Sequence, residues 1–149
     1  MEIKQRILVV DDTEMVRTTT AMMLESLVCD VEVAKSGHEA MSKVAFNDYD
    51  LILMDCQMPL MDGLETCRRL MGLYPERNLK IVAITAHTTP RDKVRSTEAG
   101  AVTWIGCHSR MRFNGTKHEE VTVARGSSST YESLRIDPVA LALDAIYTF

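Results

Sequence analysis

Short apolar runs recur along the chain up to about residue 106, and longer stretches with helical spacing separate them. The runs occupy residues 7–10, 31–34, 51–54, 81–84 and 102–105. Runs of this length are typical of buried strands, and the stretches between them predict helices. Strands separated by single helices are joined by right-handed crossovers. The pattern therefore predicts an α/β fold with a doubly wound, five-stranded parallel sheet.

The helices between these strands have predictable starts and faces. Thr13, Ser36 and Thr89 are expected N-caps, and Pro90 suits the first turn of the fourth helix. Apolar residues at helical spacing are expected to face the core: Val16, Thr20, Met23 and Leu27 in the first helix, Ala40, Met41, Val44 and Ala45 in the second, and Leu64, Cys67 and Met71 in the third.

Three acidic residues stand at the ends of two strands. Asp11 and Asp12 follow the first run, and Asp55 follows the third. Because the carboxyl ends of parallel strands meet at one edge of a sheet, we expect these carboxylates to lie close together, with the hydroxyl of Thr85 nearby. Crowded carboxylates repel one another, so a hard divalent cation such as Mg²⁺ is the expected partner. An N-capping role for the Asp11-Asp12 pair is the structural alternative.

Composition excludes several classes of protein. The chain has 149 residues, 46% of them hydrophobic, which suits a single domain with one core. A net charge of −4 disfavours direct binding to nucleic acid. The sequence shows neither a signal peptide nor a membrane-spanning run, so we expect a cytoplasmic protein without a membrane partner. The four cysteines lack the paired spacing of a zinc site or a disulfide framework.

Residues 1–106 resemble the receiver domain of two-component response regulators, which has a flavodoxin-like fold. The specific part of the resemblance is the run from Met54 to Gly63, in which Asp55, Pro59 and Gly63 occur together. The resemblance implies that Asp55 is the phosphoacceptor. It also implies that Asp11, Asp12, Asp55 and the backbone carbonyl of Gln57 hold Mg²⁺.

The resemblance assigns further roles around this site. It implies that Thr85 bonds the phosphoryl group, that Trp104 is the aromatic residue of the conformational switch, and that Gln57 and His87 modulate the lifetime of the phosphoryl group.

The function implied is that of a phosphoacceptor in a phosphorelay, whose partner is a histidine kinase or a phosphotransfer protein. Such a chain is not an enzyme, since it takes part only in its own Mg²⁺-dependent phosphorylation and dephosphorylation. The alternative is a degenerate receiver that serves as a protein-interaction module with an impaired switch or none. A homodimer stays open, as does an origin in a larger hybrid kinase.

One position departs from the receiver pattern. Receivers carry a lysine just after the fifth strand, and its ammonium pairs with the phosphoryl group. Here that position is Cys107, followed by His108. Because nearby carboxylates raise the pKa of a thiol, Cys107 cannot replace a fixed cation. His108 and Arg110 are the candidates that the local sequence offers, and the switch is expected to be weak without a replacement.

Residues 107–149 are expected to form an atypical tail in place of the last loop and helix of a receiver. Three features describe it: a hairpin signal at Asn114-Gly115, possible strand pairing between residues 121–123 and 131–136, and a short helix over residues 139–147. A disordered tail is the alternative.

Overall fold

The computed structural model describes residues 4–27, 29–85, 89–101, 103–109, 119–125 and 132–134, the last three segments through their backbone. In chain order the elements are β1 (Arg6–Val10), α1 (Glu14–Glu25), β2 (Asp30–Ala34), α2 (Gly37–Phe46), β3 (Leu51–Asp55), α3 (Gly63–Leu73), the 3-10 turn η1 (Pro75–Arg77), β4 (Ile81–Thr85), α4 (Pro90–Glu98), β5 (Thr103–Ser109), β6 (Glu119–Arg125) and β7 (Glu132–Leu134).

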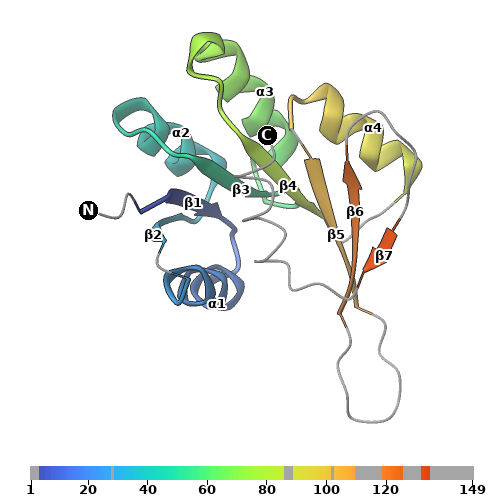
Figure 1. The fold of residues 1–149 in the computed structure, drawn as a ribbon. Coiled ribbons are helices and arrows are strands. Elements are labelled where there is room, and N and C mark those ends of the chain that lie inside the picture. Colours follow the sequence, from blue (N-terminus) through green and yellow to red (C-terminus); the bar gives the residue numbers. More distant parts are fainter. Residues whose placement is uncertain are drawn as a thin grey trace.

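The described strands form one sheet in the order β2-β1-β3-β4-β5-β6-β7. β1 to β5 pair with one another in parallel, whereas β6 pairs antiparallel with β5 and β7 pairs antiparallel with β6. Helix α1 covers one face, and α2, α3 and α4 lie on the other (Figure 1). The strand order 2-1-3-4-5 confirms the predicted doubly wound, flavodoxin-like sheet.

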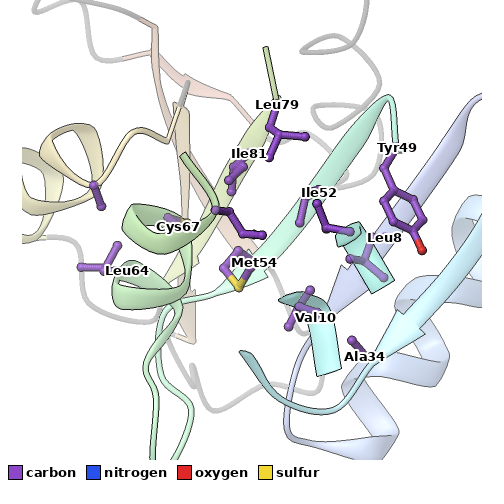
Figure 2. Close-up of a cluster of buried hydrophobic side chains, with 14 of the residues drawn as sticks. Leu8, Val10, Ala34, Tyr49, Ile52, Met54, Leu64, Cys67, Leu79 and Ile81 are labelled. Atoms are coloured by element: carbon purple, nitrogen blue, oxygen red, sulfur yellow. The ribbon is translucent and has the colours of Figure 1, made fainter. Parts of the chain in front are cut away.

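The core lies on both faces of the sheet. On the face of α2 and α3, alternate strand residues pack against the helices, as Figure 2 shows for Leu8, Val10, Ile52, Met54 and Ile81 with Leu64 and Cys67 of α3. The intervening residues on the opposite face are at most 2% exposed: Ile7, Val9, Leu51, Leu53 and Val82. Burial on both faces explains why these strands are uninterrupted apolar runs instead of alternating ones.

Helix starts follow the expected capping chemistry. The side chain of Ser36 accepts a hydrogen bond from the N–H of Glu39, and the side chain of Thr89 accepts one from the N–H of Asp92. Thr13 occupies the predicted N-cap position of α1, but its side chain makes no capping hydrogen bond. Each start lies just after the carboxyl end of a strand, so the caps help to shape the loops at that edge.

The predicted inner face of α1 is wrong. The helix buries Ala21 and Leu24, whereas Val16, Met23 and Leu27 are 49%, 38% and 46% exposed. Leu27 lies beyond the end of the helix at Glu25. The sequence offers two overlapping apolar stripes, and the structure packs the one with the small Ala21, which allows α1 to lie close to the sheet. In α2 the predicted inward residue Ala45 is likewise exposed, while Ala40 and Val44 are buried.

The fifth strand is longer than predicted. It continues past residue 105 to Ser109, because β6 pairs with it along its whole length, from Thr103 opposite Arg125 to Ser109 opposite Glu119. The expected pairing in the tail is confirmed by β6 and β7, in which Val121 lies opposite Leu134. The hairpin signal at residues 114–115 and the helix expected over residues 139–147 lie outside the described residues.

Candidate functional site

Three carboxylates meet at the carboxyl-terminal edge of the parallel sheet. β1 and β3 pair in a register that places Val10 opposite Met54, so the residues that follow, Asp11 and Asp55, reach the same edge. The carboxylates of Asp11, Asp12 and Asp55 each offer an oxygen, and these oxygens lie within 4.8 Å of one another. Asp11 is buried, Asp55 partly buried and Asp12 exposed. The fold thus brings together the three acidic residues singled out from the sequence.

Backbone groups orient the two inner carboxylates. The N–H of Thr13 donates to Oδ1 of Asp11 at 2.8 Å, and the N–H of Gln57 donates to Oδ1 of Asp55 at 3.0 Å. Within the described residues, the second oxygen of each carboxylate has no hydrogen-bond donor. Oδ2 of Asp11 is therefore available for a bound cation, and Oδ2 of Asp55 is available for a cation or for a new bond.

The cluster is costly without a cation. Burial raises the pKa of Asp55 to about 6, the N–H of Gln57 opposes this rise, and the charges of Asp11 and Asp12 add to it. Burial also raises the pKa of Asp11; a backbone N–H opposes the rise, Asp12 adds to it, and the guanidinium of Arg17 reduces it. A cation among these carboxylates would reverse both shifts, because it favours their ionised forms.

The chemistry of these donors suits a hard cation. Carboxylate oxygens are the ligands that Mg²⁺ takes in proteins, usually together with water and phosphate oxygens. Asp12, exposed beside two partly enclosed carboxylates, leaves one side of the cluster accessible to such groups. The residues present therefore fit Mg²⁺. The part expected of the Gln57 carbonyl stays a prediction.

The raised pKa of Asp55 predicts how stability depends on pH. Because the pKa is about 6 in the folded state and 3.8 as the ordinary value, folding takes up a proton between these values. The metal-free protein should therefore lose stability as the pH rises through this window. Asp55→Asn should stabilise it by roughly 1 kcal/mol near pH 7, allowing for the partial exposure of the group, and by much less near pH 4.

Urea unfolding in the presence of a chelator measures this effect. Glu76→Gln, at an exposed position away from the cluster, is the control and should leave the pH dependence of the free energy of unfolding unchanged. Equal stability of Asp55→Asn and the parent near neutral pH would contradict the proposed electrostatic cost.

Thr85 stands one strand away from Asp55. It ends β4 and is buried, and the pairing of Asp55 with Ile84 places it just beyond Asp55 along the sheet edge. Thr85 and Gln57 line a polar hollow together with residues near the start of α3 and residues of α4. The lining residues are Cys56, Gln57, Asp62, Leu64, Thr85, Asp92, Arg95 and Ser96. The structure thus places Thr85 at the end of the strand next to that of Asp55.

Other expected site residues are only partly described. His87 lies outside the described residues. Trp104 pairs with Ala83 in the β4–β5 ladder, and its backbone is described. Cys107, at the position of the receiver lysine, lies inside β5, opposite Val121. The backbone at this position is therefore that of a paired strand instead of a loop that follows one.

Arg17 is a site residue that the sequence pattern did not indicate. Its side chain is partly buried, and Nη1 donates to the main-chain oxygen of Asp11 at 2.7 Å. Side chains on a helix point toward its N-terminus, so an arginine in the second turn of α1 can reach the loop before the helix. The sequence did contain a signal for this contact, because Arg17 follows Asp11 closely and the expected helix start at Thr13 lies between them.

Comparison with known proteins gives a consistent family match. The family model of the response regulator receiver domain matches residues 7–106. The gliding motility regulatory protein of Myxococcus xanthus is 38% identical over 100 residues, which are 67% of this chain and 13% of that protein. The response regulator MprA of Mycobacterium ulcerans is 34% identical over 143 residues, which cover 90% of this chain and 61% of MprA. This chain therefore spans less than two thirds of the length of either relative.

Solved structures agree with the sequence comparisons. The chemotaxis protein CheY4 of Vibrio cholerae superimposes with a TM-score of 0.67 at 28% identity, covering 70% of this chain and 87% of CheY4. The receiver domain of a signal transduction histidine kinase from Syntrophus aciditrophicus gives a TM-score of 0.63 at 34% identity, covering 68% of this chain and 77% of that domain.

Proposed function

This chain belongs to the response regulator receiver family, and from that premise we propose that it is an Mg²⁺-dependent phosphoacceptor with Asp55 as the acceptor. The observation that carries the proposal is the meeting of Asp11, Asp12 and Asp55 at the carboxyl edge of the sheet, with oxygens within 4.8 Å of one another. Receiver domains generally bind Mg²⁺ and interact with histidine kinases or phosphotransfer proteins, and the acidic cluster supports Mg²⁺ binding here.

In the proposed reaction Asp55 acts as the nucleophile. Its Oδ1 is held by the N–H of Gln57, which leaves Oδ2 to attack phosphorus. A P–O bond forms to Oδ2, the P–N bond to the donor histidine breaks, and the electron pair leaves on the imidazole. Mg²⁺, when bound, supplies positive charge that offsets the charge of the phosphoryl oxygens. Asp11 and Asp12 would hold the cation, and the Thr85 hydroxyl would donate to a phosphoryl oxygen.

We propose no separate substrate for this chain. The product is an acyl phosphate, which water can hydrolyse to regenerate the carboxylate of Asp55. Gln57, whose side chain is exposed, and His87 are proposed to control access of that water. The chain would thus take part in its own phosphorylation and dephosphorylation and turn over nothing else.

The proposed partner is a histidine kinase or a phosphotransfer protein, and the proposed location is the cytoplasm. None of the described helices has the length and apolar character needed to span a membrane.

Acetyl phosphate offers a direct test, because a small donor needs only the nucleophile and the cation. Intact-mass spectrometry of the parent with Mg²⁺ should show one added phosphoryl group, which is absent with a chelator and absent in Asp55→Asn. Asp50→Asn keeps the acidic cluster and should be modified like the parent. Equal modification of Asp55→Asn and the parent would refute Asp55 as the acceptor.

A further inference from the structure

The phosphorylated site lacks one positive charge that receivers normally have. Phosphorylated Asp55 would carry about −2 charge beside the carboxylates of Asp11 and Asp12, while the lysine position is occupied by Cys107. A thiol carries no positive charge, so a divalent cation alone would leave the site strongly negative. A receiver that accepts phosphate with this sequence needs another cation near the cluster.

Arg17 is held at the loop that carries Asp11. Of the positively charged side chains that the structure describes, it alone hydrogen-bonds to a residue of the acidic cluster, through Nη1 and the main-chain oxygen of Asp11 at 2.7 Å. A guanidinium has five N–H donors and keeps its charge at every relevant pH. This one bond leaves donors for a phosphoryl oxygen. Its partial burial also limits screening by salt.

The other described arginine near the site is less suitable. Arg95 of α4 lines the hollow that also contains Thr85 and Gln57, but two carboxylates, Asp62 and Asp92, line the same hollow. The Arg95 side chain is exposed, and it makes no hydrogen bond to the acidic cluster. Arg17 is thus the cation that is fixed to the loop carrying Asp11.

We propose that Arg17 supplies the compensating positive charge of the phosphorylated site, in place of the missing receiver lysine. The inference rests on the proposed function and adds to it a residue that stabilises the charge of the phosphoryl group. It also predicts that Arg17 has opposite effects on Mg²⁺ binding and on phosphorylation. Arg17 repels Mg²⁺ in the resting site, because both are cations, and it attracts the anionic phosphoryl group during and after transfer.

Arg17→Gln tests this inference, because it removes the charge and keeps a side chain that can donate to the oxygen of Asp11. Mg²⁺, titrated alone and followed by calorimetry, should bind Arg17→Gln about two- to fivefold more tightly than the parent. Phosphorylation by acetyl phosphate at saturating Mg²⁺ should be slower by about the same factor. Arg17→Lys should return both quantities toward the parent values. Arg69→Gln, which removes an exposed charge on α3, should change neither.

Tighter Mg²⁺ binding together with slower phosphorylation distinguishes the proposed role of Arg17 from a purely structural one. If Arg17 only anchored the loop of Asp11, its loss would weaken Mg²⁺ binding and slow phosphorylation together, and this result would overturn the inference. If Arg17→Gln leaves both the Mg²⁺ affinity and the phosphorylation rate unchanged while the parent is phosphorylated normally, the inference is overturned and the proposed function is not. A parent that accepts no phosphoryl group would overturn the proposed function and this inference with it.

Discussion

Gly63→Ala should destabilise the fold by about 3 kcal/mol, since overpacking against rigid backbone is among the more damaging core changes. A Cβ at Gly63 would collide with the carbonyl oxygen of Asp55 and lie 2.8 Å from its carbonyl carbon and 3.0 Å from the Cα of Cys56. These are backbone atoms, so no change of rotamer relieves the contact. The same glycine lets α3 approach the end of β3, and its replacement should also disturb Asp55.

Gly72→Ala, in the same helix, is the matched control. No atom lies within 4 Å of the position that its Cβ would take. Alanine is the better helix former, so this variant should be more stable than the parent by about 0.5–1 kcal/mol. Urea unfolding of both variants gives the comparison. A Gly63→Ala protein as stable as Gly72→Ala would show that α3 does not pack so closely on the end of β3.

Asp12→Asn should weaken Mg²⁺ binding by at least about tenfold, since neutralising a charged ligand costs no less than losing a residue that supports a ligand. The carboxylate of Asp12 is exposed, so its replacement should leave the fold intact and report on the cation alone. Asn keeps an oxygen ligand but removes the charge, which carries most of the attraction for a divalent cation. Calorimetric titration with Mg²⁺ measures the change.

Glu25→Gln provides a control for this titration. Glu25 ends α1, at the end of the helix far from the acidic cluster, and it is exposed. The variant should bind Mg²⁺ as the parent does. Binding that is equally strong in Asp12→Asn would mean that the cation occupies another part of the chain, and the proposed site would have to be abandoned.

The position of the acidic site could be predicted from sequence because it depends on strand ends. Apolar runs identify β1 and β3 with little ambiguity, and the residues after a parallel strand must reach the carboxyl edge of the sheet. Asp11, Asp12 and Asp55 therefore met as expected. The hydrogen bonds from the N–H groups of Thr13 and Gln57 depend on loop conformation, which the pattern of apolar residues does not specify.

The inner face of α1 could not be predicted in the same way. Its methionines and valine favour one stripe by size, whereas the structure buries the stripe that contains Ala21 and Leu24. That choice also decides where Arg17 lies. The rotation of α1 that exposes Val16 also brings Arg17 to the loop of Asp11. Because a different rotation was predicted from the sequence, Arg17 was not identified as a site residue.

The length of β5 depends on a partner distant in sequence. Residues 106–109 contain Gly106 and polar residues, which predict little strand on their own. Pairing with β6 extends the ladder through Cys107 to Ser109. Long-range pairing of this kind overrides local preference, so the end of the strand was misplaced while its start was nearly right.

Locating the phosphoryl group tests the central claim most directly. Borohydride reduces an acyl phosphate of aspartate to homoserine, which tandem mass spectrometry can place in the sequence. After treatment with acetyl phosphate and Mg²⁺, we expect homoserine at position 55 and unmodified aspartate at Asp11, Asp12 and Asp62. Homoserine at another position, or no conversion at position 55 in a protein that binds Mg²⁺, would contradict the assignment of Asp55 as the phosphoacceptor.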